Sequence, residues 1–163
     1  MAKYVDFKFK GGKSRFTFLD KLASAKKQPT VKVGFPKSLN IRYIKSGKGK
    51  QPTVTQVAIW NEYGTIIIPK RPFMELTQID RRREVYNFQK KAMKYLLKNG
   101  GTIEGLLSLF AVKYVGYIQT AITKFDNPPN AASTISRKKG ANNPLIDTGL
   151  MRQSVTWEID DGD

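Results

Sequence analysis

Three carboxylates lie where a catalytic pocket could form, since Glu62, Asp126 and Asp147 each stand beside residues typical of turns. Acid–base or metal-assisted catalysis would need two or three carboxylates converging in a pocket of low dielectric constant. Glu62 ends a predicted short helix beside Asn61 and Gly64. A carboxylate placed there more often binds the amides of the following loop. A carboxylate–metal nuclease centred on Glu62 or Asp147 is therefore the weakest of three functional hypotheses.

The amino-acid composition excludes several kinds of chemistry. The 163-residue chain has no cysteine and no histidine, so disulfides, thiolate nucleophiles, imidazole bases and the usual zinc ligand sets are ruled out. No apolar run approaches the roughly 18 residues that a membrane span needs, and the N-terminus lacks the apolar core of a signal peptide. We expect a protein with no catalytic residue, metal or cofactor, no membrane partner, and assembly in a cytoplasm.

The charge of the chain points to acidic partners. Lysine and arginine number 29 and aspartate and glutamate 13, which gives a formal net charge of +16. Such a chain repels itself and attracts nucleic acid, acidic proteins or acidic surfaces. The chain shows no zinc-finger spacing, no RNP1-like motif and no helix-turn-helix. A DNA-binding hypothesis therefore rests on charge alone.

Residues 36–52, PKSLNIRYIKSGKGKQP, are basic without a single acid and are predicted to form a long loop or hairpin arm. Two interpretations stay open: a solvated loop, or an arm that contacts a partner or the phosphates of DNA. In the second hypothesis for the function, the protein is a basic DNA-binding accessory protein that uses this arm. The arm residues that would make the contact are Lys37, Arg42, Lys45, Lys48 and Lys50.

Hydrophobic periodicity predicts the elements that must position these residues. Period-two alternation predicts strands at residues 4–11, 30–35 and 154–159. Helices are predicted from Ser14, from Thr53 or Thr55 to Tyr63, from Pro72 to about residue 98, and over residues 102–124, with short helical turns near residues 133 and 147. The charged run DRRRE at residues 80–84 interrupts the character of the helix that begins at Pro72. This order indicates one α+β domain spanning residues 1–163. A small antiparallel sheet, built partly from the chain ends, packs against two long helices and short helices, with a basic arm.

The segment WNEYGTIIIPKRPFMEL, residues 60–76, carries a candidate interface. Pro69 and Pro72 fix their own φ angles and favour extended geometry in the residues before them, so residues 65–71 are predicted to be a stiff extended segment. Side chains alternate along an extended chain, so at least one of the three isoleucines must face outward. The candidate interface residues are Ile66, Ile67, Ile68 and Lys70. Lys70 and Arg71 are both expected to be exposed, where they could pair with an acidic partner.

Two blocks of the sequence resemble a known family. The first block, within residues 57–74, is VAIWNEYGT followed by IPKRPFM, and the second, residues 133–159, is STISRKKGANNPLIDTGLMRQSVTWEI. These blocks are similar to the two signature blocks of the tail-completion and virion-morphogenesis proteins of tailed bacteriophages, also called neck or head–tail joining proteins. The blocks occur in the same order as in that family, with two long predicted helices between them. The departures are the basic insert at residues 36–52 and the isoleucine run, where many members have a short polar connection.

The resemblance implies a structural virion protein without catalysis. It implies an α+β subunit that forms a ring, typically sixfold, at the end of the tail tube or between tail and head connector. Its partners would be copies of itself and other neck, connector or tail-tube proteins, with non-specific contact to genome DNA in the channel.

The resemblance also implies structural roles for the motif residues. Asn61 and Glu62 would hold the turn at Gly64 and Thr65, Arg71 and Phe73 would anchor the segment after it, and Asp147, Thr148 and Gly149 would cap a short helix. Whether Asp147 pairs with Lys138 or Arg152 stays open. The full set is Asn61, Glu62, Gly64, Thr65, Pro69, Arg71, Pro72, Phe73, Asp147, Thr148, Gly149 and Arg152.

Overall fold

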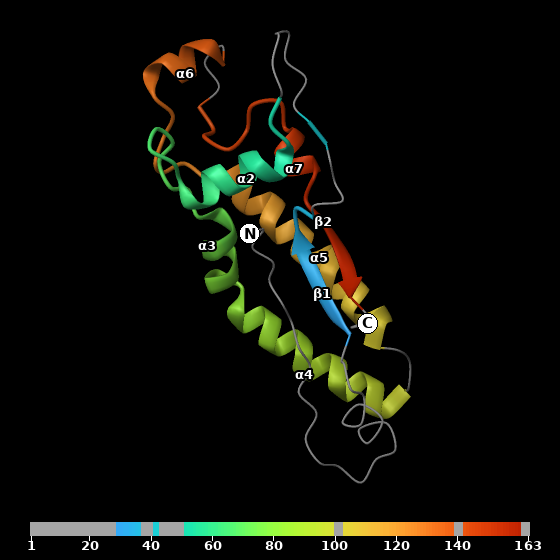
Figure 1. Ribbon diagram of the computed structural model, residues 1–163. Coiled ribbons are helices and arrows are strands. Elements are labelled where there is room, and N and C mark those ends of the chain that lie inside the picture. The colour runs from blue at the N-terminus through green and yellow to red at the C-terminus, as the bar shows by residue number, and fades with distance from the viewer. Residues whose placement is uncertain (1–28, 37–40, 43–50, 100–102, 139–141, 161–163) are drawn as a thin grey trace.

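The computed structural model describes residues 29–36, 41–42, 51–99, 103–138 and 142–160 (Figure 1). The predicted strand at residues 4–11, the helix predicted from Ser14, and Lys37, Lys45, Lys48 and Lys50 lie outside the described residues. In chain order the elements are β1 (Thr30–Gly34), α2 (Val54–Tyr63), α3 (Phe73–Asp80), α4 (Arg82–Asn99), α5 (Ile103–Lys124), α6 (Ala132–Arg137), α7 (Leu150–Gln153) and β2 (Thr156–Asp160).

Two strands from distant parts of the chain form the sheet within the described residues. β1 and β2 are antiparallel, with Val31 opposite Ile159 and Val33 opposite Trp157. Val31 and Val33 are fully buried on either side of the half-buried Lys32, so the predicted alternation of β1 is confirmed, whereas every residue of β2 is half-buried. A two-stranded sheet is marginal by itself and needs a helix against its apolar face. The α+β architecture predicted from the sequence is therefore confirmed.

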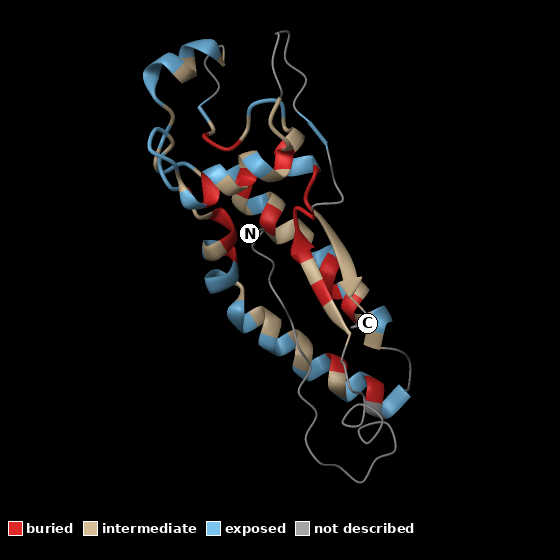
Figure 2. Cartoon of the chain, in the orientation of Figure 1, coloured by how far each residue is buried: buried red, intermediate tan, exposed pale blue. Residues whose placement is uncertain are grey.

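Helix α5 supplies the partner of the sheet and runs beneath both strands (Figure 1). Its buried residues are Leu107, Phe110, Ala111, Tyr114, Ile118 and Ile122. They recur at three- and four-residue steps, so the predicted central helix is confirmed. Figure 2 shows the buried residues gathered on β1, on one side of α5 and where α2 and α3 meet them. By length and composition alone α5 could also cross a membrane, but this apolar face is occupied by the sheet.

The predicted single helix from Pro72 to about residue 98 is wrong, because the chain breaks into α3 and α4 at Arg81. Arg81 has φ −96° and ψ 3°, and Pro72 is the N-cap residue rather than part of the first turn. The Arg81 side chain lies 4.7 Å from the centre of the Tyr117 ring and donates a 2.6 Å hydrogen bond to Glu84. The bend lets Phe88 of α4 stack on Phe110 of α5, with ring centres 4.7 Å apart.

The break is surrounded by a polar cluster on the outside of the core. Glu84 accepts hydrogen bonds from the Tyr117 hydroxyl and from Arg81. These two bonds hold the pKa of Glu84 below its ordinary value. Residues 80–84 are all charged, so none of them contributes an apolar side chain to the core. A bend at this point therefore removes few apolar contacts.

The buried Tyr114 makes stability sensitive to alkaline pH. Burial raises the pKa of Tyr114 from 10.0 to about 12, because the fold favours the neutral phenol. The stability that the neutral Tyr114 phenol gives the folded state is therefore fully present below pH 10 and is lost as the pH rises through about 12. We predict that the free energy of unfolding falls across this window more steeply in the wild type than in Tyr114→Phe, measured by urea denaturation at a series of pH values.

The control is Tyr95→Phe on the exposed side of α4, where the side chain is 54% exposed and the alkaline slope should stay that of the wild type. Equal slopes for Tyr114→Phe and the wild type would contradict the prediction.

Candidate functional site

Helix α2 begins in a capping box. Of the two predicted caps, Thr53 is the one used: its hydroxyl accepts a hydrogen bond from the backbone N–H of Gln56, whose side chain accepts one from the N–H of Thr53. Part of the basic segment 36–52 lies just before this cap. Arg42 forms an isolated antiparallel β-bridge with Thr53, and the N–H of Val54 donates to the carbonyl of Ile41. The Arg42 side chain donates to the carbonyl of Gln51 at 2.9 Å. The start of α2 thus holds Ile41 and Arg42 beside the C-terminal end of the segment.

Glu62, near the other end of α2, is buried and caps a different helix. One carboxylate oxygen accepts from the N–H of Met74 at 2.9 Å and the other from the N–H of Glu75 at 3.0 Å. These N–H groups belong to the first turn of α3, where they have no partner within the helix, and negative charge there is favourable. Glu62 thus binds the backbone amides that follow the loop, at the start of α3, and its role at the turn of Gly64 stays a prediction.

The expectation that Arg71 is exposed to an acidic partner is wrong, because only 7% of its surface is exposed and its side chain joins three segments of the same chain. Its guanidinium donates to the side-chain oxygen of Asn61 at 3.1 Å and to the carbonyls of Pro128 and Pro129 at 3.1 and 3.2 Å. Its backbone N–H donates to the carbonyl of Asn61. All of these acceptors are neutral, and burial lowers the pKa of Arg71. Asn61 in turn donates to the carbonyl of Val57, which orients its amide toward Arg71.

The isoleucine run forms a tight turn rather than the predicted extended segment. The N–H of Thr65 donates to the carbonyl of Ile68 at 2.8 Å, and the Thr65 hydroxyl accepts from the N–H of Ile68 at 2.9 Å. Ile66 and Ile67 stand at its tip with exposures of 105% and 89%, while Ile68 is half-buried. The two prolines restrict only residues 68–72, so the chain before them is free to turn.

The end of the isoleucine loop returns to the core through Phe73, which is fully buried and whose ring centre lies 6.3 Å from that of Phe35. Lys70, predicted to be available to an acidic partner, makes a 3.2 Å ion pair with Glu75 of the same chain. Pro69 is exposed and Pro72 half-buried.

The second sequence block is organised by Asn143, which sequence reasoning missed. Its side-chain N–H groups donate to the carbonyls of Ile122 and Thr123 in the last turn of α5, and its oxygen accepts from the N–H groups of Leu145 and Ile146. The only advance signal is that Asn143 stands in an asparagine- and proline-rich loop, where asparagine side chains often bind nearby backbone groups.

Lys138 closes the same loop by donating to the carbonyls of Asn143 at 2.9 Å and Ile146 at 2.7 Å. Burial lowers the pKa of Lys138, the carboxylate of Asp147 opposes this shift, and the Arg71 charge adds to it. Asp147 is exposed and, within the described residues, makes no direct ion pair with Lys138 or Arg152. Neither of the two pairings considered from the sequence is therefore present as an ion pair.

The predicted cap of the short helix α7 by Asp147 is also wrong. The N-cap residue is Gly149, with φ 79° in the left-handed region, and it makes no side-chain cap. The Thr148 hydroxyl accepts from the N–H of Leu150 at 3.3 Å. Glycine takes this conformation without steric cost, so Gly149 supplies the backbone turn and the Thr148 hydroxyl binds the first N–H of the helix. Arg152 of α7 is exposed.

The two sequence blocks meet around one open cleft of about 270 Å³. Val57 and Asn61 of α2 line one side, and Lys138, Leu145 and Asp147 line the other. Within the described part of the chain, no group of three or more carboxylates could hold a metal ion. Both Glu62 oxygens already accept backbone hydrogen bonds, so this carboxylate is not placed to act as a base. The arrangement can fix the backbone and bind by hydrogen bonds.

Comparisons with protein-family models, with curated proteins and with solved structures give no match for this chain. The resemblance to phage neck proteins therefore rests on the two sequence blocks.

Replacing Glu62 tests whether it is structural or catalytic. Glu62→Gln leaves one oxygen for two amides and removes the negative charge from the start of α3, so we predict a loss of about 1–3 kcal/mol in the free energy of unfolding, measured with urea at pH 7. Glu75→Gln, which removes a charge from the same turn of α3 together with the partly exposed ion pair with Lys70, should cost no more than about 1 kcal/mol. Equal stability of the two variants would contradict the capping role and revive the nuclease hypothesis.

Two glycines give a matched test of the loop geometry. At Gly64, φ is +77° and an added Cβ would stand 2.9 Å from the backbone nitrogen of Lys70, whereas at Gly116 of α5 nothing lies within 4 Å of it. We predict that Gly64→Ala lowers the free energy of unfolding by about 1–3 kcal/mol. Gly116→Ala should raise it by about 0.5–1 kcal/mol, because alanine favours the helix. Denaturation of both variants checks this, and effects of the same sign would refute the account of the loop.

Proposed function

We propose that this chain is a structural virion protein of a tailed bacteriophage, not an enzyme. In this proposal it forms an oligomeric ring, with six copies as the expected number, that completes or terminates the tail and joins it to the head–neck connector. The observation that carries the proposal is the loop at residues 64–71. It belongs to the first resembling block, it is braced by buried polar groups, and it presents two isoleucines to solvent.

The exposure of Ile66 and Ile67 favours contact with another protein. Burying one exposed isoleucine side chain fully is favourable by about 1.5–3 kcal/mol. Ile66 and Ile67 are exposed in the isolated chain, so this free energy is available only when another molecule covers them. The turn is already closed by Thr65, and its base is fixed by Arg71. A pre-ordered loop loses little conformational freedom on binding, so most of that gain becomes affinity.

The net charge supports a location next to acidic material. Copies carrying +16 each repel one another when they assemble, so a ring needs acidic neighbouring proteins or DNA to offset this repulsion. The channel of a virion, through which the genome passes, would supply such an environment.

A basic DNA-binding accessory protein is the second candidate. The observation that favours it is the pairing of Arg42 with Thr53 and Gln51, which holds part of the basic segment 36–52 at the start of α2. Under this candidate, DNA retention depends on Lys45, Lys48 and Lys50, and the isoleucines of the loop are dispensable.

The test is incorporation into virus particles. We predict that Ile66→Asp combined with Ile67→Asp folds as the wild type does, because neither side chain is buried, but lowers incorporation by about a hundredfold or more, since the interface no longer buries two isoleucines. Quantitative peptide mass spectrometry of purified, nuclease-treated particles gives the copy number against a capsid protein of known number. The expected wild-type value is six or a small multiple of it.

The matched control is Leu109→Asp with Val112→Asp, which makes the same change at exposed positions of α5 and should leave incorporation unchanged. Absence of the wild-type chain from finished particles, or equal incorporation of the loop variant, would overturn the proposal.

A further inference from the structure

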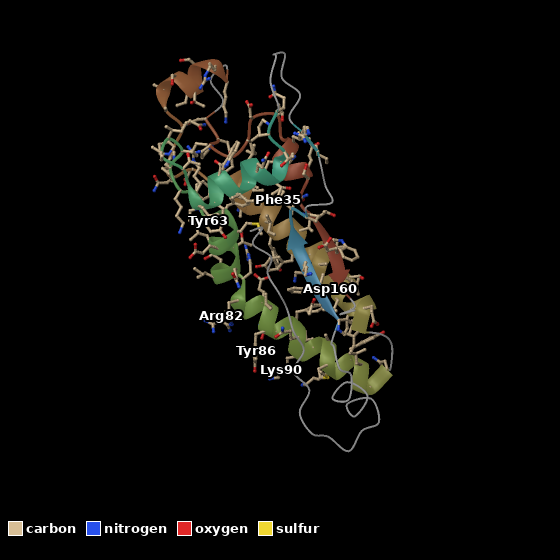
Figure 3. The ribbon with its side chains drawn as sticks, in the orientation of Figure 1. Phe35, Tyr63, Arg82, Tyr86, Lys90 and Asp160 are labelled. Atoms are coloured by element: carbon tan, nitrogen blue, oxygen red, sulfur yellow. The ribbon has the colours of Figure 1, made fainter. Side chains whose placement is uncertain are left out.

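Helix α4 carries a cationic surface that no role described above uses. With 18 residues it is about 27 Å long. Its exposed basic residues, here called the α4 cationic surface, are Arg82, Arg83, Lys90, Lys91, Lys94 and Lys98. With 3.6 residues per turn they occupy about half of the helix circumference. Figure 3 shows Arg82, Tyr86 and Lys90 pointing away from the sheet on the outer side of α4.

The opposite side of α4 is the one that packs. Ala92 and Leu96 are buried, and Val85 and Phe88 lie against the core. The cationic side therefore faces outward, because Val85, Phe88 and Ala92 on the opposite side pack against the core.

Within the described part of the chain, no ion pair joins an acidic side chain to the residues of the α4 cationic surface. Glu84, the acidic residue of α4, is engaged by Arg81 and Tyr117 at the N-terminal end. Residues 85–103 contain no carboxylate at all. Lys90, Lys94 and Lys98 follow one another at four-residue steps, so like charges stand side by side on the helix and repel each other. A surface of this kind gains from an anionic partner that carries many evenly spaced charges.

The chemistry of the surface matches a phosphate backbone. Lysine and arginine side chains only donate hydrogen bonds, and the exposed Tyr86 and Tyr95 among them add hydroxyl donors. Duplex DNA carries one negative charge per about 1.7 Å of its axis, so a 27 Å helix lies along roughly 16 phosphate charges. We propose that α4 is a sequence-independent binding surface for the phosphate backbone of double-stranded DNA.

This inference does not depend on the proposed virion role. It assigns DNA contact to a described helix, and not to the basic segment 36–52 of the second candidate function. If it fails, the loop carrying Ile66 and Ile67 keeps its proposed role, since the two surfaces share no residue.

The experiment measures binding of the full chain to a fluorescent duplex of about 20 base pairs by anisotropy, between about 50 and 200 mM salt. The variant is Lys90→Gln with Lys91→Gln and Lys94→Gln, because glutamine removes the charge and keeps a good helix former. We expect the slope of log affinity against log salt to become shallower by about three, one for each phosphate that the variant no longer neutralises. Affinity at the lowest salt should fall at least about tenfold.

The matched control is Lys45→Gln with Lys48→Gln and Lys50→Gln, which changes the net charge equally and should alter the slope by less than about one. Thermal unfolding monitored by circular dichroism should show all three chains equally folded. Equal reductions of the slope in the two triple variants would overturn the proposal by reducing the effect to overall charge. So would an unchanged slope in the α4 variant, tighter binding of single-stranded DNA of the same length, or equally effective competition by polyglutamate at matched charge.

Discussion

The burial of Arg71 is the constraint on which the rest of the site depends. A guanidinium taken out of water is costly unless its N–H groups find acceptors, and here the acceptors come from Asn61 at the end of α2 and from Pro128 and Pro129 after α5. No one of these segments can move without leaving part of the charge unsatisfied. The start of α3, the return of the isoleucine loop and the loop after the central helix are therefore positioned together.

The same use of polar groups recurs around this centre. Glu62 serves the amides that begin α3, and Asn143 serves the carbonyls that end α5 as well as the loop that follows. Each of these helix ends is thus completed by a side chain from another segment, which is one of the ways in which orphan backbone groups are satisfied. The polar side chains of the two sequence blocks are largely used in holding the backbone, which favours a scaffold over a reactive centre.

What the sequence made predictable was local. Val31 and Val33, the hydroxyl of Thr53 and the three- and four-residue spacing along α5 each report on their own neighbourhood, and the strands, cap and helix they predict are present. What the sequence did not predict are contacts between residues that lie far apart in the chain. Glu62 binds amides twelve and thirteen residues away, and the choice of Arg81 as a break depends on Glu84 and Tyr117. The turn at Thr65 was missed because the influence of Pro69 on φ and ψ extends only to the residue before it.

In the isoleucine turn, the residues that fix the shape of the loop are different from the residues that the loop exposes to solvent. Thr65, Gly64 and the backbone of Ile68 define its shape, while the side chains of Ile66 and Ile67 lie in solvent. Exchanges at these two positions leave the folding of the domain nearly untouched, because neither side chain is buried. If the loop binds another subunit as proposed, a few mutations at its tip would change the choice of partner, and each intermediate would still fold.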